Sequence, residues 1–216
     1  MGTEADIHSF IEAIASPKHD NMHNPWRDVC HTDIRSDGHL LRKERLKRHL
    51  MAPSPRLLII GEAPGYAGCR YSGLAFSSER LLMEKAIPRM TGVDGERITD
   101  RRLPWSEPSA TIVWKALYEH GLAEGVVMFN AIPWHPEGEK GIHSNRTPTE
   151  TERTDGLKYL GMLLALFPGV PVAALGNIAS RTLGEMSVEH SKLRHPANGG
   201  ATLFRDGLKH LVEGGV

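Results

Sequence analysis

The sequence predicts a single α/β domain, a three-layer α/β/α arrangement built on a central four-stranded parallel sheet. Four short apolar runs alternate with helical patterns, and this alternation implies parallel strands joined by right-handed crossovers. The expected strands are residues 57–60, 126–129, 170–175 and 191–193. The first two runs are apolar throughout, which is typical of strands buried on both faces of a parallel sheet.

Composition sets limits on the class of protein. The chain has 216 residues, so we expect one domain over 1–216, with residues 1–52 as an N-terminal helical arm packed on it. Lys plus Arg number 26 and Asp plus Glu also number 26, so the formal charge is zero. A bulk polycation is therefore excluded, and a nucleic-acid surface would need its basic residues gathered on one face.

Cysteine usage and hydropathy indicate the compartment. Two cysteines, Cys30 and Cys69, are too few for a disulfide framework or a four-thiolate cluster. No apolar run reaches membrane-spanning length, and the N-terminus MGTEADIHSF lacks a signal pattern. We therefore expect a reduced, cytoplasmic protein without a metal or other cofactor.

Helical patterns fill the N-terminal arm. Apolar spacing predicts a helix over 3–15, with Thr3 as its cap, and a second helix over 39–50. The second helix carries five basic residues, and two interpretations stay open. They form either a solvated helix face or a surface for phosphate contact.

The rest of the chain supplies the crossovers. A helix is expected over about 77–90, a long connection over 92–105, and a helix from 106 to Gly121. The stretch 131–146 looks like a polar loop. Thr147 then has the pattern of a helix cap, with proline at the first helical position and glutamate three residues after the cap.

Three polar residues each follow a different expected strand: Glu62, Asn130 and His195. The carboxyl ends of parallel strands share one edge of the sheet, so these side chains can meet in one crevice. Plainer interpretations exist for each taken alone: a surface-turn carboxylate, a strand-end cap and a histidine before a turn proline. Phe76, taken alone, fits a core residue equally well.

Five motifs occur in the order found in a known family: Gly61–Gly65, Gly73–Phe76, Asn130, Asn145–Thr149 and Arg194–Pro196. Together they resemble the uracil-DNA glycosylase superfamily, and most closely its family-4-like branch. The ordered matches span roughly three quarters of the chain. The resemblance implies the predicted sheet and hydrolysis of the bond that joins uracil, or a related deaminated base, to deoxyribose in DNA, as in base excision repair.

The resemblance also implies roles for the site residues. Glu62 would orient the attacking water and face the cationic sugar, and His195 would donate a hydrogen bond to the leaving uracil. Asn130 would read uracil and reject cytosine, while Phe76 would stack on the flipped base. Backbone groups near Ala63 and Gly65 would fix the water or the base. The DNA contacts implied are Arg146, Arg194, Ala197 and Asn198.

Several departures and alternatives remain. Ala75 replaces a proline of the family-4 pattern, and the cluster cysteines of that branch are missing. His135 and His143 are expected on a surface loop, although Gly141-Ile142-His143 faintly resembles a loop whose histidine attacks the sugar in a covalent relative. A non-catalytic or covalent uracil-DNA or nucleobase binder is therefore one alternative. A small-molecule hydrolase or nucleotide-binding protein on the same sheet is another. We expect a monomer; the preferred lesion and strandedness stay open.

Overall fold

The computed structural model describes residues 1–92, 94–141 and 143–216, and it confirms the four-stranded parallel sheet. The strand order is β3-β2-β6-β7. These strands are β2 (Leu57–Gly61), β3 (Val126–Asn130), β6 (Val172–Leu175) and β7 (Ser191–Leu193). All residues of β2 and β3 are buried, as expected for strands of a parallel sheet that is covered on both faces.

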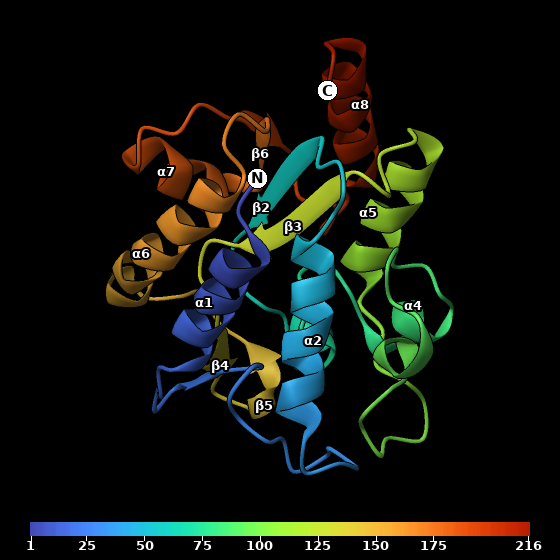
Figure 1. The fold of residues 1–216 in the computed structure, drawn as a ribbon, viewed down its shortest axis with the longest axis vertical. Helices are drawn as coiled ribbons and strands as arrows, with labels where there is room; N and C mark the ends of the chain where they lie inside the picture. Colours follow the sequence, from blue (N-terminus) through green and yellow to red (C-terminus); the bar gives the residue numbers. More distant parts are fainter.

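Helices flank this sheet and complete the three layers (Figure 1). In Figure 1, α1 and α2 lie across the sheet, with α6 beside α1, and α5 packs against α8. The helices are α1 (Glu4–Ala15), α2 (Gly38–Leu50), α3 (Cys69–Ser72), α4 (Glu79–Met83), α5 (Pro108–Glu119), α6 (Glu150–Leu166), α7 (Asn177–Glu185) and α8 (Ala201–Glu213), with a short 3₁₀ helix η1 (Gly92–Gly95).

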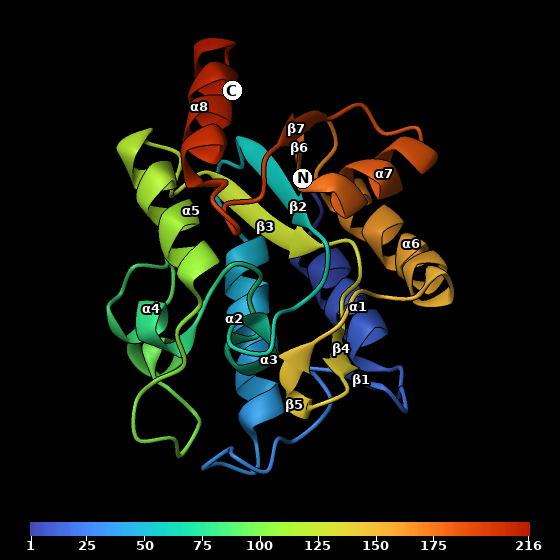
Figure 2. The ribbon, with the colours of Figure 1, turned by 180° about the vertical axis from the view of Figure 1, so that it is seen from behind.

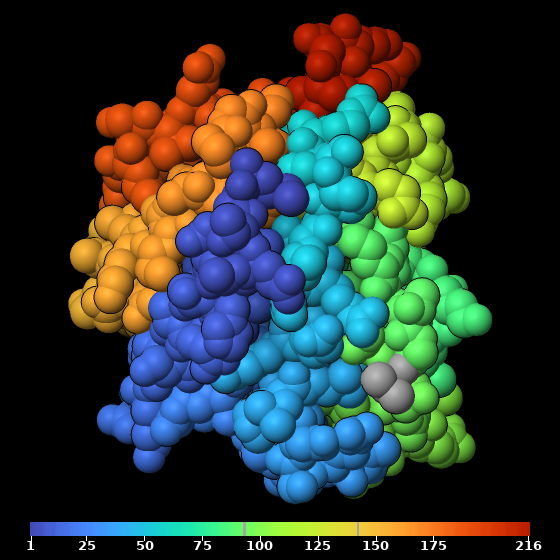
Figure 3. All heavy atoms as spheres, in the orientation of Figure 1, coloured from blue at the N-terminus to red at the C-terminus, as the bar shows by residue number. Residues whose placement is uncertain are grey.

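The N-terminal arm is part of the main core. Ile7, Phe10 and Ile14 on α1 are buried in the same apolar cluster as the sheet. The Phe10 and Phe129 rings meet edge to face with centroids 5.4 Å apart. The space-filling view shows the N-terminal residues (blue) covering the centre of this face (Figure 3). Among the described residues, no helix is both long and apolar enough to cross a membrane.

The sequence predicts two helix caps, and the structure confirms one of them. Thr3 closes a capping box with Asp6, which confirms the first cap. The expected cap Thr147 is wrong, because Thr149 caps α6 and closes its box with Glu152. The motif S/T-x-x-E occurs twice here, two residues apart, and the second copy is used.

Two other expectations are wrong. The helix expected over 77–90 ends at Met83, because Lys85 takes a left-handed φ of 56° and the chain turns. The expected loop 131–146 holds a hairpin of β4 (His135–Gly138) and β5 (Gly141–Asn145), which β1 (Met22–His23) extends to a small antiparallel sheet. Pairing with β1, which is distant in sequence, stabilises a segment that has no strand pattern of its own.

The basic side chains of α2 mostly serve internal contacts, so neither expectation for this helix holds at its buried positions. Arg42 and Arg45 are fully buried. Arg42 pairs with Asp33 at 2.5 Å and donates to the Tyr71 carbonyl. Arg45 donates to the backbone carbonyls of Ser72, Asp94 and Glu96. The two guanidinium groups therefore connect α2 to the segments around α3 and η1.

We predict that Arg42→Ala lowers the free energy of unfolding by about 3–5 kcal/mol, since it leaves the buried Asp33 carboxylate without its cation. Lys43→Ala is the matched control. It removes only the exposed pair with Glu12 and should change stability by about 0.5 kcal/mol or less. Urea unfolding monitored by circular dichroism measures both values, and equal midpoints for the two variants would contradict the assignment.

Candidate functional site

A cavity of about 590 Å³ opens at the carboxyl edge of the parallel sheet. Figure 2 shows the carboxyl ends of β2 and β3 turned toward α3 and the β4–β5 hairpin, where this cavity lies. The structure brings together in its wall six residues expected at the site: Glu62, Ala63, Gly65, Phe76, Asn130 and His195. These residues therefore meet at the carboxyl edge of the sheet, which is the edge that the strand pattern predicts.

Close packing around Gly61 holds two of these side chains. Gly61 and Asn130 are register partners across β2 and β3. A Cβ built on Gly61 would lie 2.6 Å from the Phe76 ring and 2.7 Å from Asn130 Oδ1, so only glycine fits. Phe76 itself has a left-handed φ of 48°, and its carbonyl accepts a 2.8 Å hydrogen bond from Trp114 Nε1. A bulky residue seldom adopts this backbone conformation. Here it is stabilised by the packing of the Phe76 ring against Gly61 and by the hydrogen bond from Trp114.

The Asn130 and Glu62 side chains are available to a ligand. Asn130 is 5% exposed and lines the cavity, and no hydrogen bond joins its amide to another residue in the described ranges. Glu62 is half-buried, and burial alone raises the pKa of its carboxyl group above the ordinary value. Its backbone is anchored, because the Glu62 carbonyl accepts from Ile132 N–H at 2.9 Å. Raised pKa values at cavity carboxylates are common where acid–base chemistry occurs.

The tautomer of His195 follows from its turn. The backbone N–H of Ala197 donates to His195 Nδ1 at 3.2 Å, so Nδ1 is an acceptor and the neutral ring carries its proton on Nε2. Burial, followed by the charge of Arg194, lowers the pKa of His195. The imidazole that lines the cavity is therefore neutral at neutral pH and carries its N–H donor on Nε2, and its ring lies 6.2 Å from that of Phe76.

The β4–β5 hairpin supports the turn that carries Glu62. His135 was expected on the surface but is fully buried; its Nδ1–H donates to the Pro64 carbonyl at 2.7 Å, and burial lowers its pKa to about 4. Asn145 Oδ1 accepts from Tyr66 N–H at 2.9 Å. Two side chains of the hairpin, those of His135 and Asn145, therefore hold the turn after β2 in place.

The residues expected to contact DNA fall into two groups. Arg146 lines the cavity, but its guanidinium is engaged by Glu152 through two 2.6 Å hydrogen bonds. Arg194 is exposed, Ala197 lines the cavity rim, and Asn198 is exposed in a left-handed turn with φ 53°. Arg194 and Asn198 therefore present their side chains to solvent, whereas the Arg146 charge is compensated by Glu152.

His143 behaves as expected for a surface residue. It is exposed on β5, and its ring stacks on Trp105 with centroids 5.7 Å apart. It is not among the residues that line the cavity. The Ile142 side chain of the Gly141-Ile142-His143 resemblance lies outside the described residues.

Three residues at the start of α5 line the cavity although the sequence patterns do not predict them there: Ser106, Glu107 and Ser109. Burial raises the pKa of the Glu107 carboxyl group to about 7. A topological signal was available, because a helix that leads into a parallel strand begins at the carboxyl edge of the sheet. Pro108 marks that beginning in the sequence.

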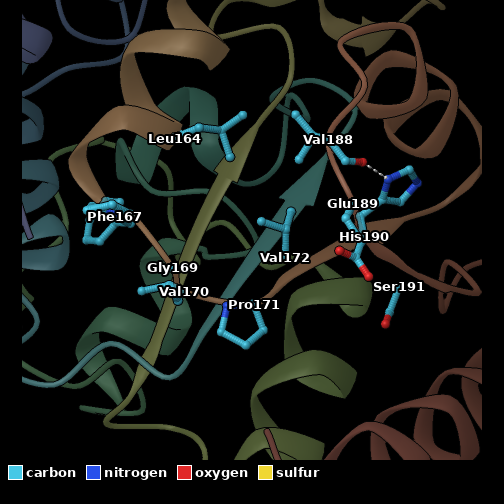
Figure 4. A pocket seen from close by; sticks show the side chains of 11 residues that line it. Leu164, Phe167, Gly169, Val170, Pro171, Val172, Val188, Glu189, His190 and Ser191 are labelled. Atoms are coloured by element: carbon cyan, nitrogen blue, oxygen red, sulfur yellow. Dashed lines mark hydrogen bonds between the residues drawn. The ribbon is translucent and has the colours of Figure 1, made fainter.

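A second hollow, of about 570 Å³, lies at the opposite edge of the sheet (Figure 4). It is lined near the starts of β6 and β7 by residues such as Val172 and Ser191. His190 points into its rim and is held by the Val188 carbonyl at 2.8 Å. Ligands of open α/β sheets bind at the carboxyl ends of strands, so this hollow is not the candidate site.

The family model described as the uracil DNA glycosylase superfamily matches residues 49–212. That segment includes every residue that lines the site cavity. The chain belongs to the uracil-DNA glycosylase superfamily.

Among solved structures, the crystal structure of wild-type SMUG2 from Pedobacter heparinus is similar to this superfamily member. The TM-score is 0.67, with 98% of this chain and 97% of that chain covered, at 14% sequence identity. At that identity the likeness shows a shared fold. A search of the curated proteins finds no match.

We predict that Gly61→Ala lowers the free energy of unfolding by about 1–3 kcal/mol, because the added methyl group overlaps the Phe76 ring and the Asn130 amide. Gly184→Ala in α7 is the control: its Cβ meets nothing within 4 Å, so the change should be neutral or stabilising. Thermal unfolding compares them, and a Gly61→Ala protein as stable as the parent would refute the packing argument.

Proposed function

We propose that this chain is a monofunctional DNA glycosylase that hydrolyses the N-glycosidic bond of uracil, or of a related deaminated base, after flipping it out of DNA. One observation carries the proposal: Glu62, Phe76, Asn130 and His195, which come from four separate segments, line one cavity. Family membership supports glycosylase-type hydrolysis and DNA as the partner. We infer that it acts as a monomer, within a single domain and in a reduced, cytoplasmic setting.

Recognition would use the two side chains packed against Gly61. Phe76 offers a ring face to the flipped base, and flipping costs a few kcal/mol that stacking partly returns. The Asn130 amide has one acceptor and two donors, so it pairs with O4 and N3–H of uracil. Cytosine presents the opposite pattern at those atoms and would leave the amide unpaired, which is how such sites discriminate.

Bond breaking would use the two titratable groups. Negative charge grows on the departing uracil, and the Nε2–H of neutral His195 donates to O2 of that anion. Positive charge grows on the sugar, and the ionised Glu62 carboxylate stabilises it and holds the attacking water. The proton of that water passes to solvent or to the released base. The process needs Glu62 ionised and His195 neutral, and the lowered pKa of His195 favours that state.

The DNA backbone would lie along an adjoining hollow of about 540 Å³ that shares Glu62 and His195 with the site cavity. Lys192 and Arg194 line it, together with Asn177 at the N-terminus of α7. Two cations and a helix N-terminus attract phosphate groups. The exposed turn at Ala197 and Asn198 would then enter the space that the flipped base leaves.

We predict that Glu62→Gln and His195→Ala each slow base release by about two to three orders of magnitude. In the parent protein the rate should fall as pH is lowered through the raised pKa of Glu62, because protonation removes the carboxylate. The assay incubates uracil-containing oligonucleotides, single- and double-stranded, and then cleaves abasic sites with alkali.

Exposed residues supply the controls for this assay: Glu119→Gln and His31→Ala should keep the parent rate. No strand breaks at uracil in either substrate would overturn the catalytic proposal. Uracil-dependent binding without release would instead support the non-catalytic alternative.

We predict that Glu62→Gln also raises the melting temperature at pH 7, by about 2 °C. The folded-state pKa of Glu62 is raised, so ionisation at neutral pH costs stability that a neutral amide does not lose. The gain should vanish at acid pH, where Glu62 is protonated in both folded and unfolded states. Thermal melts at the two pH values check the sign, with Glu119→Gln as control.

A further inference from the structure

The start of α5 places a second carboxyl group, that of Glu107, in the wall of the site cavity. Gly68 makes room for it, and Gly65 lies next to it. A Cβ on Gly68 would lie 1.7 Å from Glu107 Oε2, and a Cβ on Gly65 would lie 4.0 Å from Oε1. The carboxyl group therefore lies directly over the turn that follows Glu62, where a side chain from that turn would otherwise stand.

The position of Glu107 is fixed by contacts on both sides of it. Arg80 donates from Nε to Ser106 Oγ at 3.0 Å and from Nη2 to Thr111 Oγ1 at 2.7 Å. The backbone N–H of Arg80 also donates to the Trp105 carbonyl at 3.0 Å. One arginine on α4 therefore holds the residues before and after Glu107. These contacts fix the position of Glu107 in the cavity wall.

A neighbouring carboxylate shows what a purely structural role looks like. Glu79 is fully buried and accepts from Ile98 N–H, Thr99 N–H and the Thr99 hydroxyl at 2.7–3.0 Å. By contrast, no hydrogen bond or ion pair in the described ranges engages either side-chain oxygen of Glu107, although the group is half-buried. A half-buried carboxyl group without a protein partner has its hydrogen-bonding capacity free for a ligand.

Burial favours the neutral form of the Glu107 carboxyl group, because its pKa is raised. In a loaded site, a second ionised carboxylate in the cavity that Glu62 lines would repel both the leaving base anion and DNA phosphate. The other titratable groups that line this cavity are Glu62, Tyr66, Cys69, Arg146 and His195, and the Arg146 charge is paired with Glu152. The pKa of Glu107, raised by burial to about 7, allows it to hold a proton at neutral pH.

We propose that Glu107 is a substrate-binding residue whose protonated carboxyl group donates a hydrogen bond to O4 of the flipped uracil, an acceptor that cytosine replaces with an amino donor. This rests on the proposed function for the identity of the ligand. It adds to the strand-end residues a contact from α5, opposite the turn at Gly65. The loaded site then contains a single anionic carboxylate, Glu62, and a neutral acid that supports the base.

The test is equilibrium binding of labelled single strands that carry 2′-fluoro-2′-deoxyuridine, whose fluorine slows bond cleavage, or cytosine at the same place. Fluorescence anisotropy at about pH 6 and about pH 8 yields the ratio of the two dissociation constants. For the parent protein the preference for uracil should fall about tenfold at the higher pH, as Glu107 loses its proton.

The variants separate binding from folding. Glu107→Gln keeps a donor that does not titrate, so it should retain the preference at both pH values. Glu107→Ala should lose it at both, by about tenfold. Glu119→Gln, on the exposed side of the same helix, should titrate like the parent. If the alanine variant does not fold, the pH dependence of the glutamine variant still tests the role of Glu107.

A glutamine variant with the pH dependence of the parent, or an alanine variant with the parent preference, would overturn the role of Glu107. A parent protein that prefers uracil but leaves ordinary deoxyuridine intact would refute only the catalytic proposal. A parent protein with no preference at either pH would overturn both.

Discussion

The parallel register of β2 and β3 is the constraint on which the site depends. It sets Gly61 beside Asn130, and the missing side chain at Gly61 lets the Phe76 ring lie against both. The next residue, Glu62, is thereby directed out of the sheet edge with its backbone still paired to the continuation of β3. A single strand pairing therefore sets the relative positions of a carboxylate, an amide and an aromatic ring.

Structural features that depend on neighbouring residues could be predicted from the sequence. The buried strands and the Thr3 cap need only neighbouring residues, and the common strand edge then places Glu62, Asn130 and His195 in one crevice. Features set by distant partners were not predictable. The hairpin over 135–145 depends on pairing with β1, and Arg42 is buried because Asp33 and a carbonyl from α3 receive it.

The same division holds within the site. Glu62, Asn130 and His195 each stand at or after the end of a strand, so their convergence could be deduced. Glu107 reaches the cavity because Arg80 and Glu79 hold the segment before α5 in place. The left-handed backbone of Phe76 has no sequence signature either, since the neighbouring glycine at 73 takes the helix-ending turn expected of that residue type. Most features of the site that the sequence patterns do not predict are therefore set by contacts with residues elsewhere in the chain.

The burial of Cys69 has a consequence for the reactivity of the cavity. The thiol lies in the cavity wall, yet burial, followed by the nearby Glu107 carboxyl group, raises its pKa well above the ordinary value. Thiolate is the nucleophilic form of cysteine, so Cys69 stays inert toward electrophiles. A pocket of this kind tolerates alkylating and oxidising agents that would modify an activated cysteine, and hydrolysis there would rest on oxygen and nitrogen groups alone.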